Sequence, residues 1–245
     1  MMKRFLLITT VALGFSQASA ADLQRPVLKA PPPEALFSWA GLYIGVHAGW
    51  LRSTNSTTDI DGLQDDEGTR LGHSANSFAA GGHIGFNWQN GMWVLGAEAD
   101  ISGTGASSSV VQDLEVFDGR ARTKVSWLAS ARGRLGISPA PQWLLYGTGG
   151  VAWARIKNET LDFDDPNNTG DFTVFDPSDS SSKSSVRTGW VAGGGFEYAL
   201  SSNWIGRVEY LHYDLGNTTT VTPSEFRFRF SNRFDVVRAG LSYKF

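Results

Sequence analysis

The 245-residue sequence predicts an all-β protein, a transmembrane up-and-down antiparallel β-barrel of eight strands with short periplasmic turns and long extracellular loops. Apolar and polar residues alternate in eight separate runs with a period of two, which is the repeat of a β-strand. The connections between the runs are alternately short and long, as in barrels of the bacterial outer membrane. Aromatic residues gather at both ends of the runs, where such barrels meet the two membrane surfaces.

The beginning of the chain has the pattern of an export signal. Lys3 and Arg4 precede an apolar run at 5–15, and Ala18-Ser19-Ala20 has the form of a cleavage site. The apolar run is far shorter than the roughly 20 residues that a membrane-spanning helix needs. We therefore assign residues 1–20 to a cleavable signal peptide.

The rest of the chain divides into a lead-in and one large domain. Pro26 and Pro31–Pro33 predict that residues 21–38 form an extended, proline-rich periplasmic spacer. Residues 39–245 are assigned to the barrel. The chain has no cysteine, so no disulfide stabilises it. Cleavage removes 2 of the 21 basic residues and leaves 19 against 24 acidic ones, a balance that argues against nucleic acid as a partner.

Strand positions follow from the alternation. We expect strands at 39–51, 76–88, 92–102, 122–138, 143–157, 185–200, 204–216 and 232–245. Tight turns at 89–91, 139–142 and 201–203 alternate with long polar connections at 52–75, 103–121, 158–184 and 217–231. The even number of strands places both ends of the barrel on the periplasmic side. In the fourth run the alternation puts Val125 on the same lipid-facing side as Trp127.

The chain stops on an amphipathic strand, "VRAGLSYKF" at 237–245. In a closed barrel this strand is not a free edge, because it pairs with the first strand, at 41–50. Leu42, Ile44, Val46, Ala48 and Trp50 of that first strand would then face lipid.

The tryptophans predict two girdles at the membrane surfaces. The girdle beside the short turns consists of Trp88, Trp93, Trp143 and Trp204. The girdle toward the long loops consists of Trp50, Trp127, Trp153 and Trp190. From Trp143 to Trp153 a tilted strand covers about 25 Å of the membrane normal, which matches the apolar band of such barrels. A soluble lipocalin-like barrel would not need these girdles.

The inward faces of the strands carry charges of both signs. The expected lumen charge network consists of Glu98, Asp100, Arg132, Arg134, Glu197, Arg207, Glu209, Arg238 and Lys244. An eight-stranded barrel is only wide enough for side chains to fill, and an unpaired charge inside it is costly. We therefore expect a packed plug of ion pairs, with a narrow pore for small solutes as the alternative.

Five segments resemble one protein family. They are "WAGLYIGVHAGW" at 39–50, "LLYGTGGVAWA" at 144–154, "GWVAGGGFEYAL" at 189–200, "RVEYLHYDLG" at 207–216 and the terminal "VRAGLSYKF". The chain is similar to the porin-like outer-membrane immunogenic proteins of alphaproteobacteria. The resemblance implies a surface-exposed protein of the Gram-negative outer membrane, tied to envelope integrity and host contact. Leu241, Tyr243 and Phe245 resemble the terminal signal that the barrel assembly machinery recognises.

The sequence also bears on two other classes of activity. Some outer-membrane barrels are enzymes, but no catalytic spacing of Ser, His and Asp is present. Some members of the resembling family bind haemin, for which His73, His212 and Tyr213 are the candidate ligands at the rim. The expected partners are outer-membrane lipids and lipopolysaccharide, the assembly machinery, and host surface molecules. No catalytic residue, metal or cofactor is expected.

Overall fold

The computed structural model describes residues 37–61, 68, 70–113, 118–164, 174–223, 225 and 227–245. All of them belong to one compact unit, Leu36–Phe245. The predicted signal peptide and nearly all of the predicted lead-in lie outside the described residues. Among the described residues, no helix is long and apolar enough to cross a membrane.

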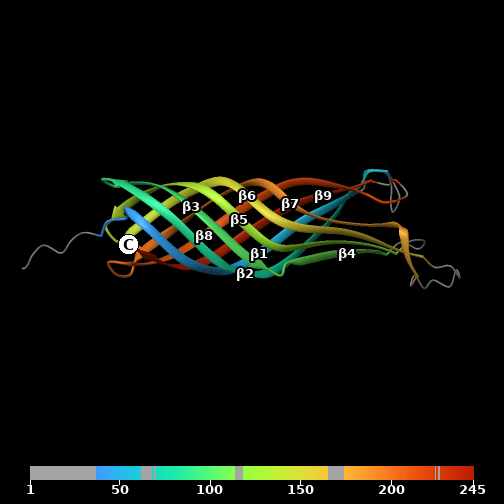
Figure 1. The fold of residues 1–245 in the computed structure, drawn as a ribbon, viewed down its shortest axis with the longest axis horizontal. Coiled ribbons are helices and arrows are strands. Elements are labelled where there is room, and N and C mark those ends of the chain that lie inside the picture. Colours follow the sequence, from blue (N-terminus) through green and yellow to red (C-terminus); the bar gives the residue numbers. More distant parts are fainter. Residues whose placement is uncertain are drawn as a thin grey trace, which may run out of the picture. The chain divides into compact units, whose positions relative to one another are not determined.

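Antiparallel β-strands make up this unit (Figure 1). Their bounds are β1 Gly41–Asp59, β2 Arg70–Asn90, β3 Trp93–Thr104, β4 Ser107–Asp113, β5 Asp118–Ala140, β6 Trp143–Asp164, β7 Val174–Ala199, β8 Trp204–Val221 and β9 Arg227–Lys244. Consecutive strands pair with each other, except that β3 and β4 both pair with β5, and the last strand pairs with the first.

The strands close into a ring of eight. The register of β1 against β9 runs from Tyr43 opposite Lys244 to Asp59 opposite Phe228, so the sheet has no free edge along this seam. Both β3 and β4 pair with β5, and β4 continues β3 after a break at 105–106. The two therefore occupy one position in the ring. The predicted fold class is confirmed.

The strands run further than their alternation predicts. Residues 52–59 and 70–75 were expected in a long connection, but they form the ends of β1 and β2. The end of β1 is rich in Ser, Thr and Asn, and neither end presents an apolar face toward lipid. Their backbone groups nevertheless pair across the ladder, with Arg52 opposite Asn76 and Thr58 opposite Arg70. Pairing with an already ordered neighbour extends a strand that side-chain pattern alone does not reveal.

A β-bulge changes the facing of side chains in β5. The register against β6 shifts between Val125 and Trp127. Val125 is fully buried inside the barrel, whereas Trp127 remains on the outer face. The expectation that both residues face lipid is therefore wrong for Val125. An extra residue in one strand reverses the alternation beyond it, and a period-two pattern cannot show where that happens.

The outer surface of the ring carries an apolar belt. In β1 the exposed side chains are apolar from Leu42 to Trp50, and the next outward residue is Arg52. In β9 the belt ends in the same way, with Val237 followed by Asp235 on the outer face. A soluble protein rarely exposes so large a contiguous apolar surface. The belt is the part of the barrel suited to lipid, and the strands continue beyond it as a polar extension.

Two adjacent glycines of β2 provide a test of the inner packing. A Cβ on Gly81 would overlap the Ile101 carbonyl oxygen and lie 2.7 Å from the Cα of Ser102, whereas a Cβ on Gly82 would meet only the Gly45 carbonyl oxygen at 3.5 Å. We expect Gly81→Ala to lower the free energy of unfolding by about 1–3 kcal/mol through overpacking. Urea unfolding in lipid vesicles, followed by tryptophan fluorescence, measures this.

Gly82→Ala is the matched control for that substitution. It adds the same methyl group to the next residue, on the opposite face of the strand, and should leave stability unchanged or slightly raised, since alanine loses less backbone entropy. Equal effects of the two substitutions would show that close approach inside the barrel is not the cause.

Candidate functional site

The inward side chains form a central layer of charges. They come from β3 (Glu98, Asp100), β5 (Arg132, Arg134), β7 (Glu197), β8 (Arg207, Glu209) and β9 (Arg238). All eight are buried, so four carboxylates face four guanidinium groups inside the barrel. We call this set the charge layer.

Cross-strand register places opposite charges side by side. Glu98 is opposite Arg132 on the β3–β5 ladder, and Glu197 is opposite Arg207 on the β7–β8 ladder. On the β8–β9 ladder, Glu209 is opposite Arg238. The backbone ladders therefore hold the two members of each pair side by side.

Contacts across the lumen join these pairs into one network. Arg132 reaches Asp100 and Glu209, each at 2.9 Å, in addition to Glu98. Arg207 bridges Glu98 at 2.7 Å and Glu197 at 2.8 Å. Because attraction between charges is strong in a confined interior and desolvation is costly, only complete pairing makes such a layer tolerable.

Two tyrosines complete the charge layer. The Tyr43 hydroxyl donates to Glu98 at 2.8 Å and accepts from Arg134 at 2.7 Å. The Tyr146 hydroxyl donates to Glu209 at 3.1 Å, and the Arg134 guanidinium lies 4.0 Å from the centre of the Tyr146 ring. Neither tyrosine was predicted to join the network, because the prediction rested on charged side chains alone. The alternation already places both tyrosines on the inward face, and this position could have identified them as partners of the charges.

A pair of histidines lies beside the charges. The Nδ1 atoms of His47 and His83 are 3.2 Å apart, and both rings are buried. Arg238 can only donate, and its Nη1 lies 3.1 Å from Nε2 of His47, so this Nε2 accepts. His47 then donates through Nδ1 to His83, which donates through Nε2 to the Ser242 hydroxyl at 2.7 Å. Nε2 of His47 also lies 2.7 Å from the Ser102 hydroxyl. The guanidinium of Arg238 thus favours one tautomer of each ring.

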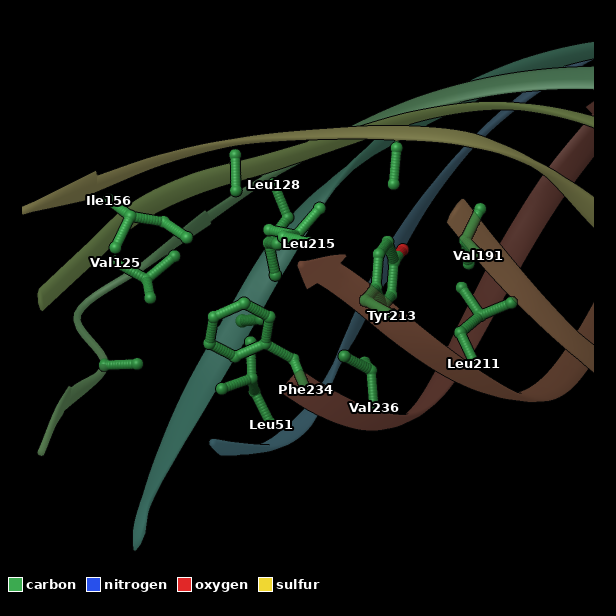
Figure 2. Packing of buried hydrophobic residues seen from close by; sticks show 14 residues of the cluster. Leu51, Val125, Leu128, Ile156, Val191, Leu211, Tyr213, Leu215, Phe234 and Val236 are labelled. Atoms are coloured by element: carbon green, nitrogen blue, oxygen red, sulfur yellow. The ribbon is translucent and has the colours of Figure 1, made fainter. Parts of the chain in front are cut away.

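Apolar layers close the lumen on both sides of the charges. Along β8 the inward residues are Ile205, then the charged Arg207 and Glu209, then Leu211 and Tyr213. On the side of the long strand extensions the layer contains Leu51, Ala79, Ala106, Val125, Leu128, Ala152, Ala154, Ile156, Val191, Leu211, Tyr213, Leu215, Phe234 and Val236. Figure 2 shows side chains from several strands meeting in this layer.

A second apolar layer lies at the end with the short turns. It contains Trp39, Val94, Leu144, Tyr146, Ala199 and Ile205, with Phe37 packed against it. Trp39 was expected to begin the first strand, but it precedes β1 and is fully buried, with its backbone N–H donating to Gln89 at 2.7 Å.

Among the described residues, no group of three or more His, Cys, Asp or Glu side chains is placed to hold a metal ion.

Lys244 does not belong to the charge layer. Its ammonium group lies 3.4 Å from the Ala40 carbonyl oxygen and 5.3 Å from the centre of the Phe37 ring, at the mouth with the short turns. Lys244 lies outside the charge layer because it is the last residue of β9, and the apolar layer at the end with the short turns separates it from the charges. Including Lys244 in the network was therefore wrong.

The tryptophans assigned to girdles lie on the outer face. Six are strongly exposed: Trp50, Trp88, Trp93, Trp143, Trp190 and Trp204. Trp127 and Trp153 are half-buried on the same face. At the chain end, Leu241, Tyr243 and Phe245 also point outward. Phe245 is 67% exposed, and its backbone N–H donates to the Leu42 carbonyl oxygen at 3.0 Å.

The candidate haem ligands are not brought together. His212 is on the outer face of β8, with Nδ1 2.8 Å from Asp235, whereas the next residue, Tyr213, is buried in the apolar layer of the lumen. Neighbouring residues of a strand point to opposite faces, so the two cannot serve one ligand. The backbone of His73 lies in β2, opposite Asn55, and not in a loop. The structure therefore contradicts a haem site shared by His212 and Tyr213.

Comparison with known proteins identifies the family. Residues 8–245 match the family described as "Outer membrane protein beta-barrel domain". The chain belongs to this family. The barrel therefore lies in the bacterial outer membrane, with its apolar belt in the lipid, and the predicted location is confirmed.

Relatives agree with this assignment. The chain is 34% identical to the 31 kDa outer-membrane immunogenic protein of Brucella melitensis, with 100% of both chains covered. It is 30% identical to the 25 kDa outer-membrane immunogenic protein of Brucella abortus, covering 100% of this chain and 99% of the relative. These proteins confirm the predicted resemblance. Among solved structures, OprG of Pseudomonas aeruginosa has 18% identity and a TM-score of 0.49, covering 84% and 96% of the two chains.

Removal of one guanidinium group tests the charge layer of this outer-membrane barrel. Arg132→Ala removes one partner each of Glu98, Asp100 and Glu209 and leaves four buried carboxylates with three guanidinium groups. We expect it to lower the free energy of unfolding by about 3–5 kcal/mol, because one buried charge is no longer compensated. Arg233→Ala is the control, because Arg233 pairs with Asp214 at the exposed surface and should matter by about 0–1 kcal/mol. Similar losses in the two variants, measured by urea unfolding in vesicles, would contradict the network.

Proposed function

We propose that this protein is a structural component of the outer membrane with a closed lumen, and that its polar strand extensions make contacts at the cell surface. The observation that carries the proposal is the stacking of three side-chain layers along the inside of the barrel. A charge layer lies between two apolar layers, and the charges are paired with one another. Water and ions would have to displace packed side chains to pass.

The proposal does not include catalysis. Among the described residues, the histidines whose side chains are placed have partners that suit a structural role: His47 and His83 are buried together, and His212 pairs with Asp235 on the outer face. The relatives are named as immunogenic proteins and not as enzymes. A small-solute porin is the main rival, since its barrel would share the same outer surface.

Conductance separates these two functions. We expect the purified, folded protein to give no reproducible current steps in a planar lipid bilayer, because the lumen is filled. Folding in the same sample is verified by the slower migration of the unheated protein in gel electrophoresis. Reproducible steps whose size changes in Arg132→Ala or Glu98→Ala would make the lumen a pathway and overturn the proposal.

We also infer that the chain end is recognised during assembly. Tyr243 and Phe245 lie outward with their rings edge to face at 5.2 Å, and Leu241 continues the same exposed face. Phe245→Ala should reduce the folded protein in the outer membrane of cells several-fold without changing refolding of the purified chain. Trp204→Ala, which removes a neighbouring exposed ring, is the control. A refolding defect as large as the cellular defect would assign Phe245 to stability alone.

A further inference from the structure

Four basic side chains lie together on the outer face of two adjacent strands. Arg122 and Lys124 belong to β5, and Arg155 and Lys157 belong to β6, which is paired with β5 (Figure 1). All four are exposed. We call them the basic patch.

The register makes the basic patch electrostatically unfavourable by itself. Lys124 is directly opposite Lys157 on the β5–β6 ladder. Like charges that face each other across a sheet destabilise it. Within the described part of the chain, the one carboxylate in an ion pair with the patch is Glu159, which lies 2.6 Å from Lys157. The patch therefore has an excess of positive charge.

Basic residues on the other side of the barrel are arranged differently. Arg52 is opposite Asp235 on the β1–β9 ladder, and Arg233 lies 3.1 Å from Asp214. Both lie outward, close beyond the apolar belt, and each has a carboxylate beside it. These two arginines thus each have their own carboxylate neighbour, whereas the four side chains of the basic patch share Glu159, which is opposite Arg122 and 2.6 Å from Lys157.

The basic patch lies at the height of the lipid headgroups. Arg155 is the next outward residue after Trp153, and it is directly opposite Trp127. These tryptophans mark the boundary of the apolar belt on the side of the strand extensions. An anion that meets both the rings and the cations must have an apolar part in the membrane and a negative group at its surface.

We propose that the basic patch binds the phosphate groups of lipopolysaccharide in the outer leaflet. Arginine and lysine side chains are the usual partners of phosphate oxygens, and a phosphate between Lys124 and Lys157 would remove their repulsion. Trp127 and Trp153 would contact the adjoining acyl chains. This goes beyond the proposed structural role and does not depend on whether the lumen conducts.

Binding of lipid A by variants of the folded protein tests the inference. In detergent micelles, native mass spectrometry gives the dissociation constant for diphosphorylated lipid A and for the same lipid without phosphate. We expect Lys124→Gln/Lys157→Gln to weaken binding of the phosphorylated lipid at least tenfold. Binding of the dephosphorylated lipid should be weak and equal in both proteins. Addition of Arg155→Gln should weaken binding of the phosphorylated lipid further.

Arg52→Gln/Arg233→Gln is the matched control. It removes the same number of charges near the same level, but from two arginines that each have their own carboxylate neighbour, and should change the dissociation constant less than twofold. An equal loss in both double variants would show that overall charge, not the patch, attracts the lipid. Equal binding of phosphorylated and dephosphorylated lipid would also overturn the proposal, as would displacement of the lipid by millimolar inorganic phosphate.

Stability in the absence of lipid provides a second measurement. If the Lys124–Lys157 repulsion is real, Lys124→Gln/Lys157→Gln should be at least as resistant to urea as the unchanged protein in lipid-free detergent. Lipid A should raise the urea midpoint of the unchanged protein but not that of the variant. A variant that is less stable without lipid would assign the two lysines to the fold and contradict the proposal.

Discussion

Closure of the sheet between β1 and β9 is the constraint on which the rest of the structure depends. In lipid no water is available for backbone groups, so each strand must have a partner on both sides. Pairing of the last strand with the first satisfies this need and makes the chain end a part of the wall. Closure also fixes a narrow interior, because eight strands leave room for side chains and little else.

The narrow interior explains why the lumen is layered. Charges on five strands are forced close together, and the register places opposite charges on neighbouring strands, so that Glu98 meets Arg132 and Glu209 meets Arg238. Apolar side chains above and below exclude water from this layer. The ion pairs consequently act between positions that the backbone already holds, which limits the entropy lost on forming them.

The outer and inner faces of the barrel contact different surroundings. The outer face is apolar only where lipid covers it, and its polar residues begin directly after Trp50 and Trp153. Beyond that boundary the same ladders continue without an apolar face, as in the end of β1 up to Asp59. The basic patch lies at this transition, where a side chain can contact headgroups and solvent together.

The sequence by itself determined the strand number, the pairing order and the apolar belt on the outer face, because a closed membrane barrel requires alternation within strands and short turns between them. The same alternation identified the eight members of the charge layer, although it also wrongly included Lys244. Only the tertiary structure decided three further features. The bulge at Val125 reverses the alternation through a local register shift, the polar strand ends are ordered by their neighbours, and Tyr43, Tyr146 and the histidine pair join the charges across the lumen. These features depend on contacts between strands distant in the chain, which a pattern within one strand cannot contain.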